Sequence, residues 1–124
     1  MDKKMDKYQN AIANYVIAKN NVSALTHNIS WHLQCCIEKN YGANADENSR
    51  TCMDKAYAYL KNAELPEYHT AEDYIRYEAN GCEFCLAAHN LVQQRRIARR
   101  NFGFAKASIT KFGNHLLFEK NEAK

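Results

Sequence analysis

Cysteine and histidine are the residues in this chain whose types and spacing could do chemistry. Cys82, Cys85 and His89 lie three and four residues apart, so on a helix they fall within about 60° of one another. Two thiolates at the start of a helix can bind one zinc ion, because the peptide dipoles there stabilise negative charge. This segment is therefore the first candidate for a metal site.

A structural zinc site needs four ligands, and this segment supplies at most three of them. His32 and Cys36 are spaced i to i+4 on one predicted helix and could supply the remainder. Other donors in the chain include His69. The predicted ligands are Cys82, Cys85, Cys36 and His32, with His89 and Cys52 as alternatives for the fourth position.

Two other interpretations of the cysteines stay open. Free cysteines often pack in protein interiors as small hydrophobic side chains, and a single Cys-x-x-Cys pair is weaker evidence than two such pairs. A redox or disulfide role is the third interpretation. A thioredoxin-like role is disfavoured because no βαβ pattern surrounds the motif, and a disulfide framework is disfavoured in a chain expected to be cytosolic.

A cluster of arginines is the second feature of the sequence that could bind a ligand or partner. Four guanidinium groups fall within two turns of the predicted last helix, and each offers planar donors suited to phosphates and carboxylates. The other side of this helix is apolar. The predicted partner-binding residues are Arg95, Arg96, Arg99, Arg100, Phe104 and Lys106.

Charge is distributed unevenly along the chain. Residues 1 to 83 carry 9 basic and 12 acidic side chains, whereas residues 84 to 124 carry 8 basic and 2 acidic ones. A basic segment on an otherwise acidic chain indicates an anionic partner, either nucleic acid or an acidic protein surface. The alternative is internal pairing of the arginines with acidic side chains of residues 43 to 83, such as Glu67, Glu72, Asp73 or Glu78.

Composition indicates one all-α domain over residues 1 to 124. The chain is 46% apolar and 25% charged, as in an ordinary globular protein, and it has one proline and four glycines, too few for the turns of an all-β fold. It contains no apolar run near the roughly 20 residues that span a bilayer and no secretory signal at its start. We therefore expect a cytoplasmic protein without a membrane partner.

The helical period predicts a small bundle of about four helices. Apolar residues recur every three or four positions from about residue 2 to 40, and an unbroken helix of that length would be about 58 Å long. Such a helix either protrudes from the domain or breaks, and the poor helix formers Asn20, Asn21 and Ser23 favour a break there. Further helices are predicted at about 50 to 64, at 71 to 79 after a Thr70 capping box, and from near Cys82 onward. The last, basic helix should pack against an antiparallel pair of N-terminal segments.

Catalytic motifs give no support for an enzyme. The sequence has no Gly-rich phosphate loop, no His-Glu-x-x-His motif and no serine in a nucleophile elbow. Cys85 and His89 lie on one predicted helix without an orienting acid or a cleft. We expect a protein that binds a partner rather than one that transforms a substrate.

The pattern Cys-x-x-Cys-x-x-x-His, followed by Arg-Arg-Ile-Ala-Arg-Arg and Phe-Gly-Phe-Ala-Lys-Ala-Ser-Ile-Thr, resembles small accessory proteins of tailed phages and prophages. The resemblance covers about a quarter of the chain, residues 82 to 112. These accessory proteins have no assigned chemistry, but small size, absent catalytic motifs and strong charge polarity are common among phage proteins that block host machinery. By this analogy we expect an anti-defence protein, of the anti-CRISPR type, that blocks a host protein or nucleoprotein complex. We expect it to act as a monomer or homodimer. Direct binding of DNA or RNA by a zinc-stabilised helical protein is the alternative.

Overall fold

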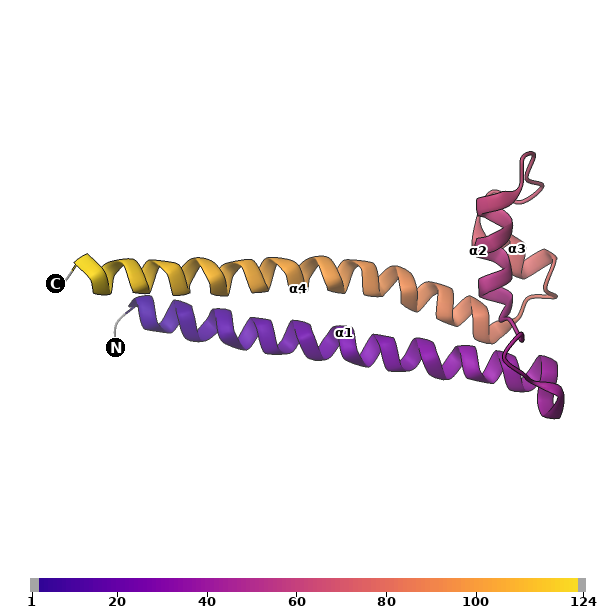
Figure 1. The fold of residues 1–124 in the computed structure, drawn as a ribbon, viewed down its shortest axis with the longest axis horizontal. Coiled ribbons are helices and arrows are strands. Elements are labelled where there is room, and N and C mark those ends of the chain that lie inside the picture. The colour runs from indigo at the N-terminus through magenta and orange to yellow at the C-terminus, as the bar shows by residue number, and fades with distance from the viewer. Residues whose placement is uncertain (1–2, 123–124) are drawn as a thin grey trace. The chain divides into compact units, whose positions relative to one another are not determined.

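The computed structural model describes the backbone of residues 3 to 122 and the side chains of residues 6 to 114. The described backbone forms four α-helices and a short 3-10 helix, with no strand, which confirms the predicted all-α class (Figure 1). The elements are α1 (Lys3–Tyr41), η1 (Gly42–Asn44), α2 (Cys52–Asn62), α3 (Ala71–Tyr77) and α4 (Glu83–Glu122).

Threonine caps fix where the two short helices begin. The Thr51 hydroxyl accepts a hydrogen bond from the Asp54 backbone N–H at 3.0 Å, and the Thr70 hydroxyl accepts one from Asp73 N–H at 3.1 Å. Each cap satisfies a backbone donor that the first helical turn leaves unpaired. The predicted start of the third helix at Thr70 is therefore confirmed, and Cys52 becomes the first residue of α2.

A left-handed turn between α3 and α4 fixes where the last helix begins. Asn80 and Gly81 have φ angles of 54° and 66°, a conformation that asparagine and glycine adopt more readily than other residues. The Gly81 N–H donates to the Ile75 carbonyl at 3.0 Å, as at many helix C-termini. The chain turns here, and Cys82 directly precedes α4.

Of the two alternatives for the first helical region, the favoured break is wrong, because α1 continues without interruption from Lys3 to Tyr41. Asn20, Asn21 and Ser23 are poor helix formers, but each costs only about 0.5 kcal/mol relative to alanine. Packing outweighs that cost, since side chains spaced alternately three and four residues apart are buried or half-buried along α1. They are Tyr8, Ala11, Tyr15, Ala18, Val22, Leu25, Ile29, His32 and Cys36. The expected antiparallel pair of N-terminal segments is therefore absent.

Contacts divide the chain into two compact units, and both long helices contribute to each of them. Unit 1 comprises Met1–Ala24 and Arg95–Lys124, and unit 2 comprises residues Leu25–Gln94. The single domain over residues 1 to 124 stays a prediction.

Unit 2 contains the larger core. The end of α1, both short helices and the start of α4 all contribute buried side chains to it. Its buried residues are Ile29, Cys36, Met53, Ala56, Ala71, Ile75, Cys82, Cys85, Ala88 and Val92.

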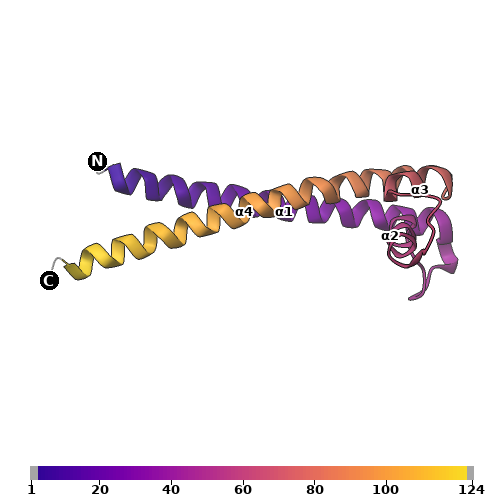
Figure 2. The ribbon, with the colours of Figure 1, turned by 90° about the horizontal axis from the view of Figure 1, so that it is seen from above.

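Unit 1 is a pair of helical segments. The first part of α1 and the last part of α4 run antiparallel (Figure 2), with the ring of Tyr8 6.5 Å from that of Phe112 and the ring of Tyr15 5.2 Å from that of Phe102. Among its described side chains, only those of Ala11 and Ala98 are buried.

Replacement of Ile75 by alanine tests the core of unit 2. Ile75 is fully buried, so Ile75→Ala should lower the free energy of unfolding by about 2–5 kcal/mol through lost burial and a residual cavity. Urea denaturation followed by circular dichroism measures the change. The control is Leu65→Ala, because Leu65 is 95% exposed and its truncation should change stability by less than about 0.5 kcal/mol. Equal effects of the two substitutions would contradict this core.

Candidate metal centre

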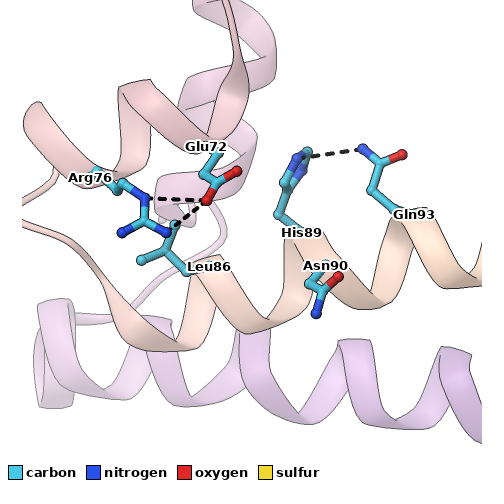
Figure 3. Close-up of a pocket in the computed structure, with 6 residues that line it drawn as sticks. All are labelled: Glu72, Arg76, Leu86, His89, Asn90 and Gln93. Atoms are coloured by element: carbon cyan, nitrogen blue, oxygen red, sulfur yellow. Dashed lines mark hydrogen bonds and ion pairs between the residues drawn. The ribbon is translucent and has the colours of Figure 1, made fainter.

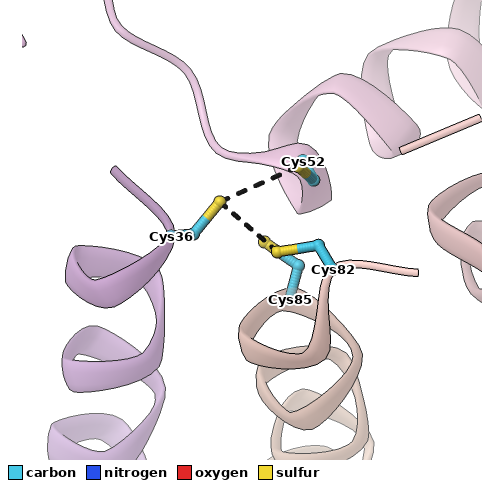
Figure 4. A group of neighbouring side chains, drawn as sticks. All are labelled: Cys36, Cys52, Cys82 and Cys85. Carbon is cyan, nitrogen blue, oxygen red and sulfur yellow. Dashed lines mark hydrogen bonds between the residues drawn. The ribbon is translucent and has the colours of Figure 1, made fainter. Parts of the chain in front are cut away.

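Four cysteine sulfur atoms converge in unit 2 (Figure 4). The Sγ atom of Cys36 lies 3.8 Å from that of Cys52 and 3.8 Å from that of Cys82. All four sulfur atoms, including that of Cys85, lie within 4.8 Å of one another. Cys36, Cys82 and Cys85 are buried and Cys52 is half-buried.

Three different helices position these thiols. Cys36 lies near the end of α1, whereas Cys52 opens α2 and Cys82 and Cys85 flank the first turn of α4. Backbone N–H groups at a helix N-terminus carry partial positive charge and stabilise nearby anions. Two N-termini meet at the cluster, so their partial positive charges would offset part of the negative charge of a metal–thiolate centre.

Two of the sulfur separations match those of a tetrahedral centre. A zinc–thiolate bond is about 2.3 Å long, so adjacent sulfurs of a regular tetrahedron are about 3.8 Å apart. The two separations at Cys36 are 3.8 Å, and all four sulfurs lie within 4.8 Å of one another. The four cysteines could therefore hold a metal ion.

Burial and mutual contact set the protonation of the metal-free thiols. Burial raises the pKa of Cys52 to about 12, with repulsion from Cys36 and Cys82 adding to it, and burial likewise raises the pKa of Cys85. Burial would also raise the pKa of Cys36, but hydrogen bonds from the Cys52 backbone and the neighbouring thiols bring it below its ordinary value. A bound cation must therefore displace protons from these thiols.

Asn40 is a supporting residue that sequence reasoning missed. Its side-chain amide lies 3.3 Å from the Cys36 sulfur and 3.9 Å from the Cys52 sulfur, and it also donates to the Cys36 carbonyl at 3.0 Å. Hydrogen bonds of this kind orient metal ligands and delocalise thiolate charge. In the sequence, Asn40 is recognisable only as an asparagine one helical turn after Cys36, a spacing too common to predict a supporting role.

Cys52 lines an open pocket at the surface of unit 2. The pocket has a volume of about 390 Å³, and Asn40, Tyr41, Lys55 and Tyr74 are among the residues that line it beside Cys52. An ion that enters this pocket would contact Cys52 first, because the other three thiols are buried.

The histidines expected as ligands lie outside the cluster. The Nδ1 atom of His32, one of the predicted ligands, hydrogen-bonds to the Asn28 carbonyl at 2.7 Å. The fourth donor in the cluster is Cys52, the predicted alternative. The other alternative, His89, pairs through Nδ1 with the Tyr57 hydroxyl at 2.8 Å. Cys52 reaches the cluster because it is the first residue of α2, a position that the Thr51 cap sets. The spacing between Cys52 and Cys82 along the sequence does not reveal this.

His89 instead borders a surface pocket of about 400 Å³ (Figure 3). Glu72 and Arg76 lie on one side of this pocket and pair with each other at 2.7 Å, which holds the pKa of the Glu72 carboxyl below its usual value. Leu86, Asn90 and Gln93 complete its lining. Neither serine nor cysteine is among these residues, so this pocket offers His89 no nucleophile to activate.

The predicted partner-binding residues lie along α4 in unit 1. Arg95 is half-buried, and the remaining members of the set, Arg96, Arg99, Arg100, Phe104 and Lys106, are exposed. Of the acidic candidates for internal pairing, Glu72 pairs with Arg76 and Glu78 accepts a hydrogen bond from the Tyr68 hydroxyl at 3.2 Å.

Comparison with protein-family models, curated proteins and solved structures finds no match to this chain.

Single cysteine replacements test the centre. Cys52→Ser should remove one of four ligands, lower the metal content per chain and destabilise unit 2, because metal binding at such sites is coupled to folding. Metal analysis of the purified protein and thermal denaturation measure both effects. The matched control is Cys35→Ser, since Cys35 is a half-buried cysteine of α1 outside the cluster. Equal metal content in the two variants would contradict the four-cysteine centre.

Proposed function

We propose that the four cysteines hold a structural zinc ion. Four thiolates in a tetrahedron are a ligand set that zinc accepts and that leaves no open position for a substrate. Soft thiolate ligands also disfavour magnesium and calcium, which prefer oxygen. The ion's role here is to fasten α1, α2 and α4 together, because its ligands come from all three helices.

Cobalt substitution tests this coordination. Co²⁺ in a tetrahedral thiolate site absorbs strongly in the visible range, and zinc should displace it because zinc binds thiolate-rich tetrahedral sites more tightly. We expect this spectrum from the wild-type and Cys35→Ser proteins and a weakened one from Cys52→Ser. An octahedral spectrum or a failure of zinc to displace cobalt would contradict the proposal.

We further propose that the protein is a non-enzymatic nucleic-acid-binding protein and that unit 1 makes the contact. The observation that carries this proposal is the division of charge between the units. Unit 1 has 12 basic and 4 acidic side chains, a net charge of +8, whereas unit 2 has 5 basic and 10 acidic side chains, a net charge of −5. Opposite charges are thus concentrated in different parts of the fold.

The arrangement of the basic residues favours a polyanion with regular spacing. Arg99, Arg100 and Lys106 are exposed on α4 and extend over about 10 Å of helix at 1.5 Å per residue. Phosphates of a nucleic-acid backbone recur over such distances, and each neutralised phosphate releases a counterion. The polar side chains of Asn101 and Thr110, also exposed on α4, can donate hydrogen bonds to phosphate oxygens.

A protein target is the second candidate, and exposed apolar residues favour it. Ile97 and Phe104 are 59% and 65% exposed next to the arginines on α4. Aromatic and arginine side chains together often dominate the energy of protein interfaces. A host nucleic-acid-processing or defence complex, blocked by this chain, is the target class that the phage-type resemblance implies.

Charge reversal on α4 tests nucleic-acid binding. The double variant Arg99→Glu/Arg100→Glu should lose most of its affinity, and the slope of log affinity against log salt should flatten by about two units. Fluorescence anisotropy with labelled single-stranded and duplex oligonucleotides over a salt series measures both quantities. Circular dichroism should show unchanged helical content, because exposed charges contribute at most about 1 kcal/mol each to stability.

The matched control is Lys39→Glu/Lys61→Glu, which changes the net charge equally but on exposed residues of unit 2. This control should retain most of the affinity. Equal losses in the two double variants, or binding insensitive to salt, would contradict the proposal. A wild-type protein that binds no oligonucleotide but captures a protein from nuclease-treated host lysate would favour the second candidate.

A further inference from the structure

Cys52 differs from the other three thiols of the cluster in its access to solvent. Cys36, Cys82 and Cys85 are buried, whereas Cys52 is half-buried and lines the surface pocket of about 390 Å³. A small solute that enters this pocket therefore reaches the sulfur of Cys52 before the other three. The reactivity of the cluster toward solutes should depend on this one residue.

The sulfur of Cys36 is close enough to that of Cys52 for a bond to form between them. The two Sγ atoms are 3.8 Å apart, and a disulfide bond is about 2.05 Å long, so they need to approach by about 1.7 Å. Cys36 lies near the end of α1 and Cys52 is the first residue of α2. The chain between these helices holds only the short η1 and a loop, and loops accommodate such shifts more readily than helices do.

Metal coordination would place Cys52 in its reactive form. A thiolate, rather than a thiol, is the nucleophile toward oxidants. Burial raises the pKa of the metal-free Cys52 thiol to about 12, but a bound metal ion deprotonates a coordinating thiol outright. The inference that follows therefore rests on the zinc centre proposed above, in which Cys52 is a thiolate at neutral pH.

We propose that Cys52 is a peroxide-reactive site and that its oxidation ends in a disulfide with Cys36. The co-reactant is hydrogen peroxide, which is small and uncharged. The Cys52 sulfur attacks one peroxide oxygen, the O–O bond breaks, and the departing hydroxide takes a proton from solvent to become water. The product at Cys52 is a sulfenic acid.

The second step uses the neighbouring sulfur. The Cys36 sulfur attacks the Cys52 sulfur, an S–S bond forms, and the S–O bond breaks as a second hydroxide leaves and is protonated to water. Two thiolates, one hydrogen peroxide and two protons thus give one disulfide and two waters. The two electrons that the sulfurs lose reduce the peroxide.

This disulfide would remove two of the four ligands of the zinc ion. Cys82 and Cys85 alone are too few to hold a structural zinc ion, so the ion should be released. The disulfide joins only α1 and α2, whereas the zinc ion would also join the start of α4 to them. Oxidation should therefore loosen the first turns of α4 while α1 and α2 stay linked.

Peptide mapping of peroxide-treated protein tests the disulfide. The zinc-loaded Cys35→Ser protein is suitable because it retains the four cysteines of the cluster and lacks the fifth. Trypsin places Cys36, Cys52 and the pair Cys82 and Cys85 on three different peptides, because lysine or arginine stands between them in the sequence. Peroxide should join the peptides of Cys36 and Cys52. A first disulfide between any other two cysteines would overturn the proposal.

Zinc release is measured in the same reaction with a zinc-binding dye. One zinc ion should appear for each disulfide formed, and a reducing agent should allow the protein to bind zinc again. A protein that binds zinc but keeps it under peroxide, with no disulfide formed, would overturn this inference and leave the zinc centre standing. A protein that takes up no zinc would overturn the zinc centre and this inference with it.

Matched serine replacements separate solvent access from proximity. Cys52→Ser and Cys82→Ser each remove one ligand, but only the first removes the accessible sulfur. Cys52→Ser should lose the fast phase of thiol oxidation, whereas Cys82→Ser should keep it and still form the disulfide between Cys36 and Cys52. Equal rates of thiol loss in the two variants would overturn the proposal.

Hydrogen exchange keeps the test decisive if either variant fails to fold, because it uses the Cys35→Ser protein alone. After peroxide treatment, amide exchange should increase in the first two turns of α4, residues 83 to 90, and stay slow in α2, residues 52 to 62. Unchanged exchange at the start of α4 in the oxidised protein would contradict the loss of its link to the zinc ion and overturn the proposal.

Discussion

Convergence of four thiols from three helices is the constraint on which unit 2 depends. Cys36, Cys82 and Cys85 belong to its buried core and Cys52 packs against that core, while Cys52 begins α2 and Cys82 directly precedes α4. The fully buried side chains of this core are small, and the largest of them is that of Ile75. An ion bound by all four sulfurs would supply the stabilisation that apolar burial in so small a unit does not provide.

A helix cap and a tight turn set the positions of three of these cysteines. The Thr51 cap sets the position of Cys52, while the left-handed turn at Asn80 and Gly81 sets the start of α4 and with it Cys82 and Cys85. The amide of Asn40 then contacts two of the sulfurs from the end of α1. The cap, the turn and the Asn40 contacts each involve residues close in sequence, but together they bring the sulfurs of Cys36, Cys52, Cys82 and Cys85 into one cluster.

Charge is divided unevenly between the two units. Most acidic residues belong to unit 2 and most basic ones to unit 1. Within unit 1, Arg99 and Lys106 lie on one side of α4, and Ile97 and Phe104 lie on another.

The all-α class, the Thr70 cap, the basic character of the last helix and the shared face of Cys82 and Cys85 follow from local spacing and composition, so the sequence alone predicts them. Local propensity favoured a break in α1 at Asn20 to Ser23 over one long helix, because it does not include the packing that keeps the helix whole. The sequence also favoured His32 over Cys52 as the fourth ligand. Only the tertiary structure shows that Cys52 belongs to the cluster, because its place there depends on how α2 packs. The spacing of residues along the chain does not determine the direction in which the loop before α2 runs.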